Sequence, residues 1–136
     1  MKIKEDALAL PIEKTLVALI EGVLAEKGVA CSQCVILNFR DPSYRAKEGG
    51  YHPVEIMLDK NGLIQYITDF AYMGQGDFAE LDKELDFDFA AGVFQQMGKC
   101  YPIADGWELF AVWQSNFCAY FEWGVFAVST TIWGDV

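Results

Sequence analysis

His52 is the only histidine in this chain of 136 residues, so any imidazole acid–base chemistry must use it. A general base needs a group that orients its ring, and Asp41 or Glu55 could do this in a hydrolase. No known catalytic motif surrounds these residues, and Ser43, a nearby hydroxyl, follows a proline in a predicted turn. The alternative is structural: His52 holds its own loop by hydrogen bonds before Pro53. We favour this alternative and predict no catalytic residue.

Arg40, Asn38 and Glu55 form a second group that could do chemistry. Alternation along two predicted strands places all three on one face of a sheet. There Arg40 would bind a carboxylate or phosphate, and Asn38 would orient it. Tyr44 and Tyr51 of the intervening loop would add flat contact area. The structural alternative is a cross-strand ion pair between Arg40 and Glu55, which contributes little when exposed.

Cys31 and Cys34 have the C-x-x-C spacing of a zinc half-site or a redox pair. A structural zinc ion would need two more ligands, and Cys100 and Cys118 do not form a second close pair. A thioredoxin-like dithiol begins a helix after a strand, whereas this pair precedes a predicted strand. We therefore predict free thiols, no metal and no cofactor.

Asp86 and Asp88 alternate with phenylalanines and could hold a divalent cation beside Asp82 or Glu84. In an extended segment, however, the two aspartates share a solvent face while the phenylalanines are buried. This second interpretation is ordinary amphipathicity, and we prefer it.

The formal net charge of -10 limits the classes of partner. Nucleic-acid binders need a basic stripe, and the nearest thing to one is Arg40, Arg45 and Lys47. Direct binding to nucleic acid or to an anionic membrane is therefore not predicted. The acids of residues 69–88 raise a further hypothesis, a decoy that imitates DNA phosphates, which requires them to gather on one exposed face. Solubility is the simpler explanation.

No apolar run approaches the ~18 residues that a membrane-spanning helix needs. Glu5 and Asp6 lie where a signal peptide would have its apolar region. We predict a cytoplasmic protein with reduced cysteines. Trp123 and Trp133 lie near the ends of predicted elements and, if exposed, would favour a homodimer or a partner interface.

Hydrophobic periodicity predicts the elements that position these groups. A helix from Pro11 to Gly28 is followed by strands at about 34–40, 54–59 and 63–72, and a hairpin turn at 59–62 joins the last two. Two registers are possible for this hairpin. We prefer the one that keeps one face apolar, which sets Val54, Ile56 and Leu58 beside Thr68, Tyr66 and Ile64.

The second half is predicted to hold short helices within 77–85 and 93–98, an extended segment at 85–89, a helix from Asp105 to Gly124 and a strand at 125–133. Asp105 and Glu108 match a helix-capping pattern. The helices at 11–28 and 105–124 each have an apolar face to bury. We therefore predict one α+β domain over residues 1–136, with two layers: an antiparallel sheet of about four strands and helices packed on one face.

Two motifs carry a resemblance to a known family, NFRDPSY at 38–44 and GGYHPVEI at 49–56. Together with YITDF at 66–70 and the pair Asn116-Phe117, they resemble a family of uncharacterised bacterial proteins, domain of unknown function 2787. The resemblance covers most of the chain and implies a small bacterial intracellular protein. It implies no activity and no catalytic residue. Cys31 and Cys34 are not part of the family pattern, which argues against a shared metal role.

The loop between the strands at 34–40 and 54–59 is the predicted functional region, because polar, glycine-rich loops on rigid strands often carry binding sites. The leading hypothesis is a non-enzymatic domain that binds a protein or a small ligand there. The candidate binding residues are Asn38, Arg40, Asp41, Tyr44, Tyr51, His52 and Glu55.

Overall fold

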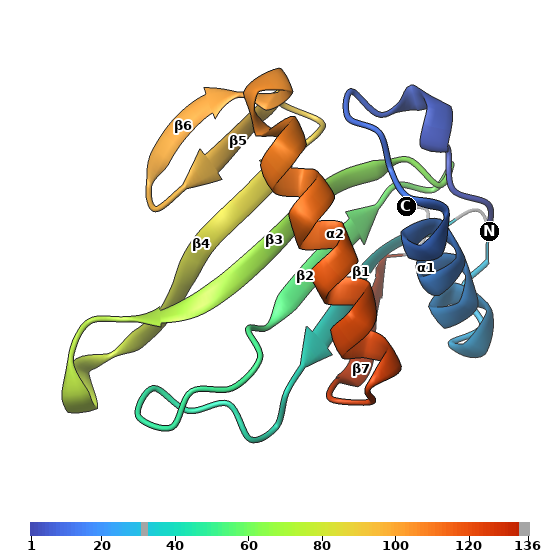
Figure 1. Ribbon diagram of the computed structural model, residues 1–136. Helices are drawn as coiled ribbons and strands as arrows, with labels where there is room; N and C mark the ends of the chain where they lie inside the picture. The colour runs from blue at the N-terminus through green and yellow to red at the C-terminus, as the bar shows by residue number, and fades with distance from the viewer. Residues whose placement is uncertain (31–32, 134–136) are drawn as a thin grey trace.

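A seven-stranded antiparallel sheet forms the frame of the protein in the computed structural model, which describes residues 1–30 and 33–133 (Figure 1). The strands lie in the order β6-β5-β4-β3-β2-β1-β7, so the last strand pairs with the first at one edge. Among the described residues, no helix is long and apolar enough to cross a membrane. The strands are β1 (Cys34–Arg40), β2 (Val54–Leu58), β3 (Ile64–Met73), β4 (Glu80–Asp88), β5 (Val93–Gln96), β6 (Lys99–Pro102) and β7 (Ala127–Trp133).

Helix α1 (Lys14–Glu26) confirms the first predicted helix, although it begins at Lys14 rather than at Pro11. Its N-terminus is held from outside the helix. The backbone N–H of Glu13 donates to Oε1 of Gln114 on helix α2 (Trp107–Glu122) at 2.7 Å, and Nε2 of Gln114 donates to the carbonyl of Pro11 at 3.2 Å. A buried amide on one helix thus replaces the missing side-chain cap of the other.

Helix α2 confirms the predicted long helix and crosses the sheet (Figure 1). The predicted cap by Asp105 is wrong: this residue lies in a 3-10 turn, Ile103–Gly106, and no side chain caps the helix. Gly106 occupies the N-cap position and packs against Phe94, whose ring atoms would lie 3.0 Å from a Cβ there. Close packing against β5 therefore decides this helix start.

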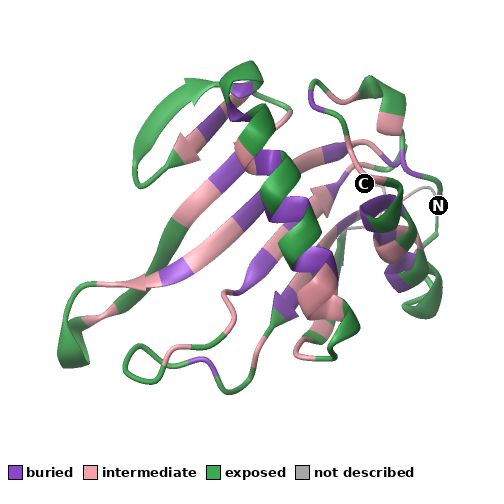
Figure 2. Cartoon of the chain, in the orientation of Figure 1, coloured by how far each residue is buried: buried purple, intermediate pink, exposed green. Residues whose placement is uncertain are grey.

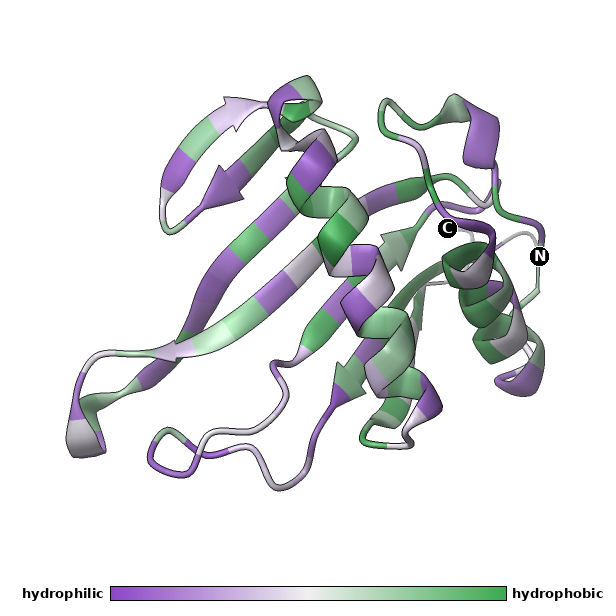
Figure 3. Cartoon of the chain, viewed as in Figure 1, coloured by the Kyte–Doolittle hydropathy of each residue, from purple (hydrophilic) through white to green (hydrophobic). Residues whose placement is uncertain are grey.

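Buried residues alternate with less buried ones along β1 and β2, so their buried side chains share one face of the sheet (Figure 2). Hydrophobic and hydrophilic residues are interspersed along the sheet and along α2 (Figure 3). This face and both helices share one hydrophobic cluster, which confirms an α+β fold with an antiparallel sheet. Its members include Val35, Leu37, Phe39, Ile56, Leu58, Ile67 and Phe87 from strands, and Leu16, Ile20, Leu24, Phe110, Trp113 and Phe117 from helices.

The predicted register of the β2–β3 hairpin is correct only near the turn. Leu58 lies opposite Ile64, as predicted, but Ile56 lies opposite Ile67 and Val54 opposite Asp69. The register shifts between Met57 and Leu58, where β3 has one extra residue. Because of this residue, Ile64 and Ile67 of β3 both face the core. This shift also carries Asp69 onto the helix-covered face.

The sheet has seven strands rather than about four, because the region from 80 to 102 is extended. The short helices predicted within 77–85 and 93–98 are wrong: only a 3-10 turn at Gly76–Phe78 precedes β4, and β5 and β6 form a hairpin. Gln96 pairs with Lys99 across a two-residue turn. Met97 and Gly98 have φ values of 51° and 82°, as a type I′ hairpin turn requires.

Polar groups lie on the opposite face of the sheet. Thr68 on β3 faces Asp86 on β4, and both are buried. The hydroxyl of Thr68 donates to Oδ1 of Asp86 at 2.8 Å, while Nζ of Lys83 lies 3.5 Å from Oδ2. Phe87 is buried as predicted, but Asp86 does not lie in solvent. Its charge is paired instead, which offsets the cost of burying it.

Candidate functional site

A cleft of about 300 Å³ lies between α2, the chain before β2 and the helix-covered face of the sheet. We call it the helix-side cleft. Aromatic side chains make up half of its lining residues, and the rings of Tyr51 and Tyr120 contact each other at a centroid distance of 4.7 Å. Its lining residues are Gly50, Tyr51, His52, Val54, Asp69, Trp113, Asn116, Phe117, Tyr120 and Phe126.

Asp41 folds the loop that brings Tyr51 and His52 to this cleft. Its Oδ1 accepts hydrogen bonds from the N–H and the hydroxyl of Ser43, at 2.9 and 2.7 Å, and its Oδ2 accepts the N–H of Tyr51 at 3.0 Å. The hydroxyl of Ser43, followed by these backbone donors, lowers the pKa of the Asp41 carboxyl. Gly50 is required beside it, since a Cβ there would lie 2.9 Å from both Oδ2 of Asp41 and Cα of Tyr44.

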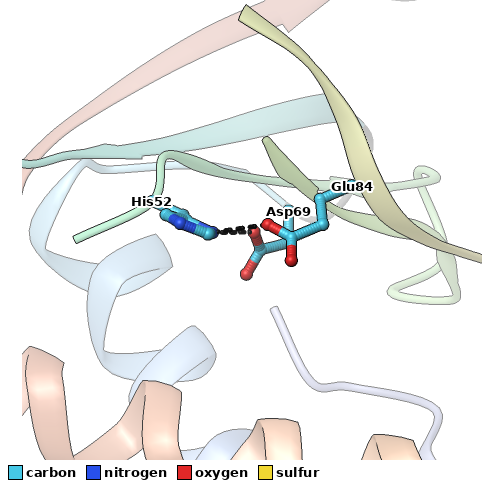
Figure 4. A group of neighbouring side chains, drawn as sticks. All are labelled: His52, Asp69 and Glu84. Carbon is cyan, nitrogen blue, oxygen red and sulfur yellow. Dashed lines mark hydrogen bonds and ion pairs between the residues drawn. The ribbon is translucent and has the colours of Figure 1, made fainter. Parts of the chain in front are cut away.

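His52 meets two carboxylates at one ring nitrogen (Figure 4). Its Nδ1 lies 2.9 Å from Oδ1 of Asp69 and 3.0 Å from Oε2 of Glu84. The hydrogen bond to Asp69 raises the pKa of His52, and the charges of both acids act in the same direction against partial burial. His52 and Glu84 are about one-third exposed, whereas Asp69 is 14% exposed.

Asp69 is held from its other side by helix α2. The indole Nε1–H of Trp113 donates to Oδ2 of Asp69 at 3.0 Å. The ring of Trp113 is fixed in turn by packing on Phe117, with centroids 4.9 Å apart and nearly parallel planes. The cluster of His52, Asp69 and Glu84 therefore rests on the hydrophobic core.

Asn38, Arg40 and Glu55 lie on the opposite face and line a second hollow of about 280 Å³. We call it the opposite-face hollow. Asn38 pairs directly with Glu55, as the predicted shared face requires. The predicted ion pair between Arg40 and Glu55 does not form among the described residues. Glu55 instead accepts a hydrogen bond from the hydroxyl of Tyr66, and burial together with this bond raises the pKa of Tyr66.

The sequence comparison now identifies the family. A family model described as "Protein of unknown function (DUF2787)" matches residues 14–131. The chain belongs to this family. The resemblance found in its motifs is therefore confirmed. No curated protein matches the chain.

Two solved structures from Vibrio cholerae are similar to this member of the family. Hypothetical protein VC0508 from the VSP-II pathogenicity island is 39% identical, with a TM-score of 0.78, over 91% of this chain and 96% of its own. Conserved hypothetical protein VC1805 from the pathogenicity island VPI-2 is 43% identical, with a TM-score of 0.79, over 91% and 97%. The second is described as sharing structural homology with the human p32 protein.

The predicted binding residues do not form one site. Tyr51 and His52 line the helix-side cleft, whereas Asn38, Arg40 and Glu55 line the opposite-face hollow. Asp41 is occupied by the hydrogen bonds that shape its loop, so it is not available to orient His52.

Tyr44 is buried rather than a surface contact. Its hydroxyl accepts the N–H of Tyr72 at 3.1 Å, and its ring lies 5.5 Å from that of His52. It therefore anchors the loop to β3 and supports the histidine.

Asp69, Glu84 and Trp113 were not predicted as site residues. The YITDF motif at 66–70 contains Asp69, but only the shifted register shows that this residue faces the helices. Trp113 belongs to the core cluster and also lines the cleft, where its Nε1–H donates to Asp69. Glu84 was considered only as an additional ligand of a cation at Asp86 and Asp88, and its orientation toward His52 depends on an irregularity in the β3–β4 pairing.

Three of the four cysteines lie in the part of the chain that the structure describes. Cys34, Cys100 and Cys118 are free, whereas Cys31 lies outside the described residues. Cys118 is buried on α2, and burial raises the pKa of its thiol.

Proposed function

We propose that this protein binds a small organic molecule in the helix-side cleft and acts there as a ligand-binding domain. The observation that carries this proposal is the composition of the cleft wall. Five of its side chains are aromatic: Tyr51, Trp113, Phe117, Tyr120 and Phe126. Ligand pockets typically combine such apolar walls with a few polar groups, and volumes of about 300 Å³ lie at the lower end of their range.

The polar groups of the cleft indicate the charge of its ligand. Asp69 contributes a carboxylate, Asn116 an amide and His52 an imidazole. Among the described residues that line the cleft, none is lysine or arginine. An aromatic wall beside a carboxylate favours a flat neutral or cationic molecule over an anion. The ligand class is therefore a small neutral or positively charged compound with a flat apolar part.

The motifs that identify the family also support the cleft as the functional site. Gly50, Tyr51 and His52 come from the GGYHP motif, and Asn116 and Phe117 form the later pair. Residues 50–52 and α2 thus meet at one place although they lie far apart in the sequence. A cytoplasmic location of this binding domain stays a prediction.

Ligand-observed NMR with a fragment set sorted by charge tests the proposal. Neutral and cationic aromatic fragments should give saturation-transfer signals, and Asn116→Ala or Tyr120→Ala should remove them. Arg40→Ala is the matched control, because Arg40 lines the opposite-face hollow. Fragment binding that survives both cleft variants, or that is lost in Arg40→Ala, would show that the cleft is not the site. Circular dichroism of each variant checks that its fold is intact.

A hydrolase is the second candidate function, because His52 lines a cleft and has a carboxylate within hydrogen-bond distance. The orienting acid is Asp69, in place of the predicted Asp41 or Glu55. The described lining residues include no serine, threonine or cysteine, so water would be the nucleophile. Hydrolysis of nitrophenyl esters that His52→Ala abolishes and Arg40→Ala preserves would support this function. An unchanged rate in His52→Ala would exclude it.

The decoy hypothesis loses its basis, since the acids of residues 69–88 do not share one exposed face. Asp69 and Glu84 meet at His52, while Asp86 is buried on the opposite face beside Thr68. Asp77, Glu80 and Asp82 remain exposed, so only part of the acidic set lies at the surface.

A further inference from the structure

The arrangement around Nδ1 of His52 is more than one hydrogen bond needs. An imidazole nitrogen carries a single proton and donates it along one direction. Here Oδ1 of Asp69 and Oε2 of Glu84 both lie within 3.0 Å of that nitrogen. All three atoms lie within 4.8 Å of one another (Figure 4). We propose that His52, Asp69 and Glu84 bind a divalent transition-metal ion, with Nδ1 of His52 as its nitrogen ligand.

The distances suit such an ion. Bonds from nitrogen and carboxylate oxygen to zinc-like ions are about 2.1 Å long, so two ligands at a right angle lie about 3.0 Å apart and two at a tetrahedral angle about 3.4 Å. The observed separations from Nδ1 are 2.9 and 3.0 Å. Each carboxylate would need to move away from Nδ1 by at most a few tenths of an ångström, about what ligands ordinarily adjust on metal binding.

The backbone aims Glu84 at this point through a bulge between β3 and β4. Asp69 lies opposite Leu85, and Phe70 lies opposite Lys83, so Glu84 is the extra residue of β4. Regular alternation would turn Glu84 away from the face that Leu85 shares with Asp69. A β-bulge re-aims side chains in this way, and bulges are frequent next to functional sites.

Trp113, which is not itself a metal ligand, fixes the orientation of Asp69. Oδ2 of Asp69 accepts the Nε1–H of Trp113, which leaves Oδ1 toward His52. Metal-binding carboxylates are commonly held by a second hydrogen bond of this kind. Because Trp113 belongs to the core, the position of Asp69 does not depend on a mobile loop.

The donor set indicates the class of metal. One imidazole nitrogen and two carboxylate oxygens suit Zn²⁺, Mn²⁺, Fe²⁺ or Co²⁺, whereas Ca²⁺ and Mg²⁺ prefer oxygen ligands alone. Two carboxylates balance the charge of a divalent ion, and the net charge of -10 favours its capture. Three protein ligands leave coordination positions free for water, as in catalytic rather than structural sites.

This inference does not rest on the proposed binding of an organic molecule, because metal affinity is measured without one. It does compete with the second candidate function. A metal ion on Nδ1 takes the lone pair of that nitrogen and displaces the proton that Asp69 accepts. His52 bound in this way would not be oriented by Asp69 as a general base.

Isothermal titration of EDTA-treated protein with Zn²⁺, Mn²⁺ and Mg²⁺ tests the site. A background carrying Cys31→Ser and Cys34→Ser removes the C-x-x-C pair as a rival zinc site. We expect one Zn²⁺ per chain, weaker Mn²⁺ binding and at least tenfold weaker Mg²⁺ binding. Glu84→Gln should weaken Zn²⁺ binding at least tenfold. Glu80→Gln is the matched control, an exposed glutamate on the same strand, and should leave the affinity unchanged.

Nitrogen-15 NMR of His52 gives a readout that needs no variant. Since His52 is the only histidine, its ring gives a single set of imidazole signals. Stoichiometric Zn²⁺ should shift the Nδ1 resonance into the range of a metal-bound nitrogen. An imidazole spectrum that does not change with Zn²⁺, equal affinity in Glu84→Gln and Glu80→Gln, or Mg²⁺ binding as tight as Zn²⁺ binding would each overturn the proposal.

Discussion

Trp113 on α2 and Asp69 on β3 are joined by a hydrogen bond of 3.0 Å from the indole Nε1–H to Oδ2. This bond connects the helix to the sheet at the wall of the helix-side cleft, which both residues line. It is also the point where the core meets the His52 cluster, because the other oxygen of Asp69 faces His52. Packing and site geometry therefore depend on the same aromatic side chain.

The substitution Trp113→Phe should separate these two contributions. The smaller phenyl ring keeps much of the stacking on Phe117 but has no N–H to donate to Asp69. A hydrogen bond to a charged group contributes about 1.5–3 kcal/mol, so the free energy of unfolding should fall by about this amount. Urea unfolding followed by circular dichroism measures it.

Trp123→Phe is the matched control for this experiment, because Trp123 is 66% exposed at the end of α2. Its substitution should change the free energy of unfolding by less than about 0.5 kcal/mol. If the two variants are equally stable, the bond between Trp113 and Asp69 does not stabilise the fold.

Gln114→Leu should destabilise the packing between the two helices. Gln114 is buried, and its amide serves both the N–H of Glu13 and the carbonyl of Pro11. Leucine fills a similar volume but leaves both backbone groups without their partner. Each unsatisfied buried group costs about 1–3 kcal/mol, so the expected loss is at least about 2 kcal/mol in urea unfolding.

The same substitution at Gln75 provides the comparison. Gln75 is exposed in the connection between β3 and β4, and its side chain caps no helix. Gln75→Leu should leave the midpoint of unfolding almost unchanged. A similar small effect of Gln114→Leu would mean that water satisfies Glu13 and Pro11 as well as the amide does.

Periodicity predicted the elements that pack against one another, including α1, α2 and the first three strands. It failed within 80–102, except that the extended segment predicted at 85–89 overlaps β4, because short apolar runs suit a helix or a strand equally well. In this region the two-residue turn at Met97-Gly98 joins β5 and β6 into a hairpin, so both segments are strands. A methionine with φ of 51° is not a usual hairpin signal, and only Gly98 marked the turn.

The candidate site was predicted in part. His52 was identified as the only histidine and Tyr51 as a flat contact surface on the loop, and both do line the cleft. Asp69 and Glu84, the partners of His52, were not identified. Two shifts of strand register place them beside His52. Bulges of this kind follow from tertiary packing and leave no period in the sequence.

The carboxylate of Asp41 should make stability depend on pH in the acid range. Its pKa is lowered in the folded protein, so the ionised form stabilises the fold above the ordinary value of 3.8. This contribution is lost as the pH falls through the lowered pKa. Asp41→Asn should therefore be less stable than the wild type at pH 7, and the difference should shrink as the pH falls below about 4.

Urea unfolding of both proteins between pH 7 and pH 3 measures this dependence. Asp77→Asn is the control, since Asp77 is exposed and belongs to a different loop. A difference between wild type and Asp41→Asn that stays constant over the whole range would contradict the assignment. The carboxylate would then act through its shape rather than its charge.

Gly50→Ala should disturb the loop that positions Tyr51 and His52. Gly50 has a φ of 138°, and a Cβ there would lie 2.9 Å from Cα of Tyr44 and from Oδ2 of Asp41. Gly49 has a φ of 75° but nothing within 4 Å of its Cβ position. Both alanine variants are therefore strained, by about 1–3 kcal/mol each, and only Gly50→Ala adds a collision.

We expect Gly50→Ala to be less stable than Gly49→Ala by a further 1–3 kcal/mol or so, as overpacking usually costs. Two-dimensional NMR should show larger shifts of the Tyr51 amide and the His52 ring in Gly50→Ala, because the hydrogen bond from Tyr51 to Asp41 must open. Equal stability and equal spectra for the two variants would show that the close approach of Gly50 to Tyr44 does not shape the loop. The position of His52 would then have to be set from the other side, by Asp69 and Glu84.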